Sequence, residues 1–171
     1  MSASPHHRLP SRLLLLLALG ATACGHPIED GTWRLQQDLR QATTLDTCAL
    51  LPADGKLGEG GLLVTGVAVR LVIPVPGPST PVPMVGRFKN PLGGEPDEFF
   101  LEGSVSDERM VVRGASCPVQ FGQSQLQATV QDAGTFTGTL KARYELGPSG
   151  EASCPATCDV EVGVRGDRQA K

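Results

Sequence analysis

The chain has 171 residues, 40% of them hydrophobic, and a net charge of −3 at pH 7. This length fits one domain, and so much hydrophobic content with so little charge is not typical of a disordered chain. The residues from position 24 onward include 13 basic and 18 acidic side chains, a net charge of −5, and no stripe of basic residues interleaved with aromatics. We therefore expect no nucleic-acid partner, because a phosphate backbone would be repelled.

The first 23 residues have the three zones of an export signal. Arg8 and Arg12 supply a positive start, residues 13–20 (LLLLLALG) are apolar, and the small residues Ala21-Thr22-Ala23 precede Cys24. The apolar run is far shorter than the roughly 20 residues that a membrane-spanning helix needs. The pattern predicts a signal peptide over residues 1–23.

The residues around Cys24 resemble the lipobox of bacterial lipoproteins. Ala21-Thr22-Ala23-Cys24 is followed by Gly25, although the family usually has Leu where this chain has Ala21. The resemblance implies a diacylglycerol on the Cys24 thiol, cleavage before Cys24 and acylation of the new amino group. Membrane lipid, reached through this acyl anchor, would then be a partner. Cleavage after Ala23 by an ordinary secretory route, which leaves a free cysteine, is the alternative.

The anchor would set the location of the protein. Cys24 is the odd one of five cysteines, and an unpaired thiol in an exported protein is a liability, which favours lipidation. Residues 24–30 would form a short tether. The family's sorting rule reads the residue after the cysteine. Gly25 is not the Asp that retains lipoproteins at the inner membrane, so we expect the cell envelope, with the outer membrane favoured.

The first half of the folded part contains two ambiguous segments. Residues 33–45 fit a helical spacing through Leu35, Leu39 and Ala42, or a strand through Trp33, Leu35, Leu39 and Leu45, and we favour the strand. Residues 62–73 are apolar at both odd and even positions, as in a strand covered on both faces or bent sharply at Gly66. Residues 74–83 hold five prolines and predict a loop. Residues 84–88 resume a short strand.

The second half shows clear alternation of apolar and polar residues. Residues 125–131 and 135–146 each place their apolar side chains at every second position, and the turn at 132–134 between them predicts a hairpin. Residues 98–107 form a further strand, with 110–113 as its expected hairpin partner. Residues 159–165 repeat the alternation through Val160, Val162 and Val164.

Together these segments predict one all-β domain over residues 31–171. Seven or eight antiparallel strands in a meander must bury a shared apolar face, either as a closed barrel or as a two-sheet β-sandwich. The triplet Gly31-Thr32-Trp33 and the later Arg165 resemble the lipocalin pair in which a first-strand Trp packs beneath a last-strand Arg and closes the base of the barrel. The alternative is an ordinary core Trp and a surface Arg.

The remaining cysteines suggest disulfides rather than a metal. Two bridges, in any of three pairings, are expected in an exported domain, and a four-thiolate zinc site is the alternative; the residues are Cys48, Cys117, Cys154 and Cys158. No C-x₂-C pair is present. An acidic group, Glu95, Asp97 and Glu98, could offer oxygen ligands to calcium but lacks the spacing of a ligand loop. We therefore expect no metal site and no cofactor.

Histidine is absent beyond position 26, which removes Ser-His-Asp and Cys-His catalysis. No pair of carboxylates is placed for sugar hydrolysis, although that route stays formally open. We expect a non-catalytic, lipid-anchored protein that binds a small apolar ligand or an envelope partner. The alternative is a structural or assembly lipoprotein with a filled core and a protein-binding surface.

Overall fold

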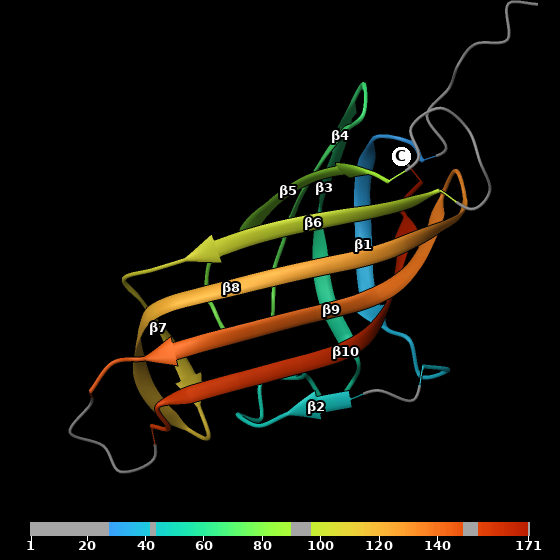
Figure 1. Cartoon of the computed structure of the whole chain (residues 1–171). Helices are drawn as coiled ribbons and strands as arrows, with labels where there is room; N and C mark the ends of the chain where they lie inside the picture. Colours follow the sequence, from blue (N-terminus) through green and yellow to red (C-terminus); the bar gives the residue numbers. More distant parts are fainter. Residues whose placement is uncertain (1–27, 42–43, 90–96, 149–153, 171) are drawn as a thin grey trace, which may run out of the picture.

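A computed structural model describes residues 28–41, 44–89, 97–148 and 154–170. These residues form an all-β sheet that closes into a barrel (Figure 1). Neighbouring strands are antiparallel in the order β1-β3-β4-β5-β6-β8-β9-β10, and β10 pairs back onto β1. The strands are β1 (Gly31–Gln37), β2 (Thr44–Asp46), β3 (Lys56–Thr65), β4 (Ala68–Ile73), β5 (Val82–Phe88), β6 (Glu98–Val105), β7 (Glu108–Val112), β8 (Ala115–Asp132), β9 (Thr135–Leu146) and β10 (Thr157–Arg168).

This closure confirms the predicted all-β meander and decides for the barrel over the sandwich. The predicted hairpin of residues 125–146 is confirmed as the end of β8 and all of β9. In β9, Leu140 and Tyr144 are fully buried, whereas Lys141 and Arg143 between them are exposed. Alternation along each strand therefore separates an apolar interior from a polar exterior, as expected of an antiparallel sheet with one wet face.

The segment 62–73 is two strands rather than one. β3 and β4 pair with each other from Thr65–Ala68 outward, and the turn between them contains Gly66 with a φ of 61°. Glycine adopts this left-handed conformation without steric cost, so it permits a tight turn instead of the predicted bend. Leu63 and Val67, which made the segment look apolar on both faces, are half-exposed on the outside.

The predicted hairpin between residues 98–107 and 110–113 is wrong. β6 and β7 both run antiparallel to β8, β6 against Gly122–Thr129 and β7 against Ala115–Val119. They therefore follow one another along the same edge of β8. The chain passes from β6 to β7 through Asp107, which has a φ of 58° and donates its backbone N–H to Val119 O. The hairpin that does form joins β7 to β8.

A similar interruption resolves the ambiguity of residues 33–45 in favour of strand. β1 pairs with β10 from Trp33–Arg168 to Gln37–Val164, and β2 continues along the same edge from Thr44–Val162. Trp33 and Leu35 point into the core. Leu39 lies in the turn after β1 and is 91% exposed, and Leu45 in β2 is half-exposed. The apolar spacing of Leu39 and Leu45 therefore reflected no buried face.

We name the two ends of the barrel from the start of the described chain: the near end is the one at which Ile28 lies, and the far end is the opposite one. The near end holds Ile28–Gly31, the β3–β4 turn, the β8–β9 turn and the last residues of β10. The far end holds β2, β7, the start of β10 and the loop of residues 74–81. The proline-rich loop predicted over residues 74–83 is therefore confirmed except for Val82 and Pro83, which lie in β5. β5 pairs with β6 only from Val85, so Pro83, which has no backbone N–H to donate, lies outside the β5–β6 ladder.

Candidate functional site

The interior of the barrel is filled by its own aromatic side chains. Trp33 and Phe99 each lie against Phe136 with ring centroids 5.3 Å apart, and Phe88 meets Phe99 edge-on at 6.0 Å. All four rings are at most 4% exposed. Tilted and edge-to-face pairs at these distances are favourable packing geometries. This aromatic cluster occupies the space in which a barrel of this size could otherwise hold a small ligand.

Two inward-facing glycines show how tightly the interior is packed. A Cβ on Gly166 would lie 2.3 Å from the Phe136 ring, and one on Gly122 would lie 2.6 Å from the Tyr144 ring. Both distances are shorter than real carbon contacts, so each ring covers the surface that its glycine leaves free. Each aromatic ring therefore occupies the volume that a side chain at the glycine position would otherwise take.

The near end is closed by the chain that enters β1. Ile28 is 1% exposed, and the Trp33 indole Nε1–H donates to the Glu29 carbonyl at 3.2 Å. The Glu29 N–H in turn donates to Ala133 O in the β8–β9 turn at 3.1 Å. The entering segment therefore crosses this end of the barrel and is fastened on both sides.

The far end is closed by the proline-rich loop. Val75, Pro76 and Pro78 are buried, and the Tyr144 hydroxyl donates to Pro76 O at 2.6 Å. Burial raises the pKa of Tyr144 above its ordinary value of 10.0, which keeps the phenol neutral and able to donate. This buried hydrogen bond fixes the loop over the core.

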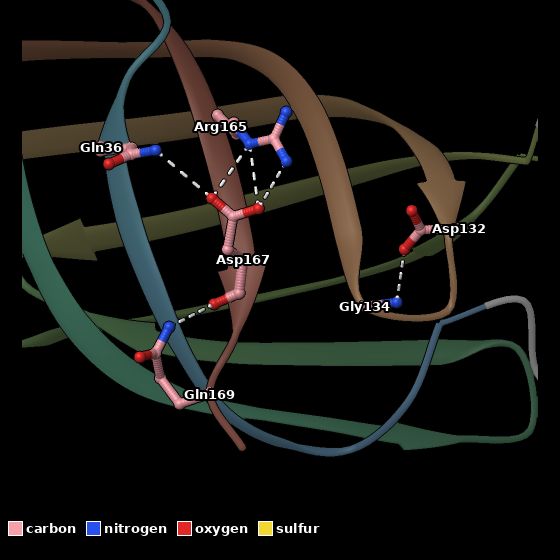
Figure 2. Close-up of polar contacts among 6 residues, drawn as sticks. All are labelled: Gln36, Asp132, Gly134, Arg165, Asp167 and Gln169. Carbon is pink, nitrogen blue, oxygen red and sulfur yellow. Dashed lines mark hydrogen bonds and ion pairs between the residues drawn. The ribbon is translucent and has the colours of Figure 1, made fainter.

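The structure does not bring Trp33 and Arg165 together as the resemblance to lipocalins implies. Arg165 lies opposite Gln36 in the β1–β10 ladder and is directed to the outer surface, where its guanidinium binds the Asp167 carboxylate at 2.8–3.0 Å (Figure 2). Gln36 donates to the same carboxylate at 3.3 Å. This hydrogen bonding raises the pKa of Arg165 above its ordinary value.

Arg168, which the sequence analysis did not single out, occupies the position expected of Arg165. It is the ladder partner of Trp33, its Nε donates to Asp30 O at 3.0 Å, and its guanidinium pairs with Glu29. Arg168 thus holds the same entering segment that the Trp33 indole binds. The two arginines are three positions apart on one strand, an odd offset, so their side chains lie on opposite faces of the sheet, and Arg168 is the one on the face of its ladder partner Trp33.

The four cysteines of the domain form two disulfides. Cys48 pairs with Cys158 and Cys117 pairs with Cys154, with Cα–Cα distances of 5.6 and 5.7 Å. Both bridges lie at the far end. This settles a pairing that the spacing alone left open, and it uses the thiols that the zinc alternative required. Cys24, the predicted lipidation site, lies outside the described residues.

The acidic group offers little to a metal among the described residues. Glu98 forms an ion pair with Lys89 at 2.8 Å, and Glu95 lies outside the described residues. Within the part of the chain that the structure describes, no three His, Cys, Asp or Glu side chains gather closely enough to hold a metal ion. The same part contains no apolar helix of the length that crosses a membrane.

The outer surface carries one face that differs from the rest, which we call the β3–β6 face. It consists of exposed apolar side chains separated by arginines; its members are Leu63, Val67, Arg70, Val85, Arg87 and Phe100. The apolar members are 42–57% exposed. Ladder partners build it in two rows, Leu63–Arg70–Val85 and Ala68–Arg87–Phe100.

A depression of about 630 Å³ opens on this face between Val67, Arg87 and Phe100. Among the described residues neither Arg70 nor Arg87 forms an ion pair. The outer face of β8 to β10 is different, because its charges are paired as Lys141–Glu161 and Arg143–Asp159. Apolar groups beside unpaired cations make the β3–β6 face the candidate functional surface of the molecule.

Comparison of the sequence with models of known protein families, and with curated proteins, finds no match. The candidate surface therefore depends on geometry alone. Sequence reasoning missed it because its residues are scattered: β3, β4 and β6 contribute one each, β5 contributes two, and Val67 lies in the turn between β3 and β4. The signal that could have found it was the apolar character of odd positions 63 and 67, which the single-strand interpretation of residues 62–73 absorbed.

Proposed function

We propose that this protein is a non-catalytic, lipid-anchored component of the bacterial cell envelope that works through its outer surface and binds no ligand inside the barrel. The observation that supports this choice is the packed interior, filled by aromatic rings and closed at the near end by Ile28 and at the far end by the proline-rich loop. A ligand-binding barrel needs a cavity lined by apolar side chains. The structural or assembly role with a filled core is therefore preferred to the binding of a small apolar molecule.

The anchor supplies the location in this proposal. Two or three acyl chains on Cys24 would make attachment effectively permanent, since each buried CH₂ contributes about 0.8 kcal/mol and one chain alone holds only marginally. Gly25 favours the outer membrane over the inner. The lack of histidine beyond position 26 supports a non-catalytic role, as does the fixed hydrogen bond of the buried Tyr144.

Intact-mass analysis of the protein purified from membranes tests the anchor. The expected result is a chain that begins at Cys24 and carries the added mass of acyl chains. The matched control is Cys24→Ser, which should lack the added mass and leave the membrane fraction. A soluble, unmodified product beginning at Cys24 would contradict the anchor.

Extraction of the purified protein with organic solvent tests the filled core. After delipidation of the surface, mass spectrometry of the extract should find no non-covalently bound apolar molecule in stoichiometric amount. One such molecule per chain would overturn the proposal in favour of a ligand carrier.

A further inference from the structure

The β3–β6 face lies beside the point where the anchored segment joins the barrel. The Asp30 carboxylate accepts a hydrogen bond from the Val64 N–H at 2.6 Å, next to Leu63 of this face. Val67 lies in the turn that follows β3, at the near end. The first described residues and the apolar face therefore share one corner of the molecule.

The tether is too short to hold this corner away from a membrane. Four peptide steps separate Cys24 from Ile28, and a fully extended chain covers about 14 Å over that distance. The headgroup region on each side of a bilayer takes up roughly 5–8 Å of the total thickness. An acylated Cys24 would therefore place the near end at the lipid surface whatever path residues 25–27 take.

We infer that the β3–β6 face is a lipid-docking surface, which seats the barrel on an anionic membrane with Phe100, Val67 and Leu63 toward the headgroups. This inference depends on the proposed lipid anchor. Aromatic and aliphatic side chains enter the headgroup boundary, and arginines attract anionic lipids while their stems cover apolar surface. The face has both kinds of group, and Arg70 and Arg87 alternate with the apolar side chains on neighbouring strands.

Charge distribution favours lipid over a second copy of the chain. Residues 24–171 carry a net charge of −5, so two copies repel each other and most of the surface is repelled by an anionic bilayer. The β3–β6 face is the exception. Of its acidic neighbours, Glu98 forms an ion pair with Lys89. Glu102, the ladder partner of Val85, accepts a hydrogen bond from the neutral Gln125 amide, so the face has two arginines against one carboxylate without an ion pair.

Two matched tryptophan variants test which face meets the lipid. Phe100 is 42% exposed at the near end, and Phe121 is 46% exposed on β8 at the far end, so Phe100→Trp and Phe121→Trp are equivalent apart from position. The native Trp33 is buried and gives a constant background. The full-length variants are purified from membranes and reconstituted into vesicles of phosphatidylcholine with phosphatidylglycerol, in which the acyl chains are brominated to quench tryptophan fluorescence.

We expect the brominated lipids to quench the emission of the introduced tryptophan about twofold in Phe100→Trp and hardly at all in Phe121→Trp. The reason is that docked apolar groups lie roughly 5–10 Å into the headgroup boundary. Adding Arg70→Gln and Arg87→Gln to Phe100→Trp should reduce the quenching in vesicles that contain phosphatidylglycerol. Equal quenching of both tryptophans overturns the inference. So does protection of Phe100→Trp by a co-purified protein or by a dimer.

Flotation of the same samples with the vesicles separates this inference from the anchor. Protein that floats while its Phe100→Trp emission is unquenched keeps its anchor and lacks the docking face. Protein that fails to float has neither a working anchor nor a docking face, and this result overturns both proposals.

Discussion

The two ends of the barrel are stabilised by different means. At the near end the described contacts are packing and hydrogen bonds, in which Trp33 and Arg168 fasten the segment that enters β1. At the far end both disulfides cross-link the chain, and the proline-rich loop closes the core. The strands at the near end are regularly paired, whereas the far end consists of the three-residue β2, loops and interrupted strands.

This difference shows where covalent bonds are needed. A ladder of paired strands holds its register through many hydrogen bonds, and a buried aromatic ring stabilises the strands that it contacts. Loops have few such contacts and a high conformational entropy, which a cross-link lowers in the unfolded chain. The following substitutions disturb one end at a time, from the largest expected effect to the smallest.

Removal of the Cys48–Cys158 bridge should have the largest effect. The bridge spans 110 residues of sequence, and the chain-entropy estimate for a loop of that length is about 5 kcal/mol. Cys48→Ala with Cys158→Ala should therefore lower the free energy of unfolding more than Cys117→Ala with Cys154→Ala, whose bridge spans 37 residues and for which the estimate is about 4 kcal/mol. Urea unfolding without reductant measures both. The reverse order would contradict a contribution set by loop length.

Trp33→Ala should cost about 3–5 kcal/mol, the range for deleting a large buried aromatic side chain. The indole is 1% exposed, contacts Phe136 and donates to Glu29 O, so the change opens a cavity and frees the near end. Urea unfolding is again the measurement. Phe121→Ala, at a half-exposed position, is the control and should cost under about 1 kcal/mol. Similar losses would mean that the near end does not depend on the aromatic cluster.

Tyr144→Phe should cost about 1–3 kcal/mol, because it leaves the buried Pro76 carbonyl without its donor. The wild-type protein should also lose stability as the pH rises above about 10, the ordinary pKa of tyrosine. The raised pKa of Tyr144 means that the folded chain keeps a proton that the unfolded chain releases, so the free energy of unfolding falls with rising pH. Unfolding curves at several alkaline pH values measure this slope. Tyr144→Phe should show a shallower slope, and equal slopes would contradict the assignment.

Arg168→Gln should have the smallest effect, about 1 kcal/mol, since the residue is partly exposed and loses one ion pair and one hydrogen bond. Arg165→Gln is its matched control and should cost less, because Arg165 binds only an outer-surface carboxylate two residues away on its own strand. Unfolding measurements on the two variants compare them directly. A larger loss for Arg165→Gln would restore the pairing that the sequence suggested.

The elements that the sequence predicted well were those with one wet face. Residues 135–146 alternate without interruption, and every apolar member of the run faces the core. Residues 62–73 were misread because Leu63 and Val67 are apolar yet face outward. They make the segment apolar at both odd and even positions, so the sequence pattern did not mark the turn between β3 and β4. The candidate surface was missed for the same reason, since an exposed Val or Phe cannot be distinguished in sequence from a buried one.

The sequence by itself determined that the chain is a meander of strands, because side-chain direction alternates with a period of two and is therefore written in local order. It also determined the presence of four cysteines suited to disulfides and of a lipobox-like Cys24, which stays a prediction. Only the tertiary structure decided that the meander closes into a barrel, which cysteines pair, that Arg168 lies opposite Trp33, and that the interior is full. Each of these depends on which residues meet across the ladder of strands distant in sequence, and that register is set by the packing of the whole core.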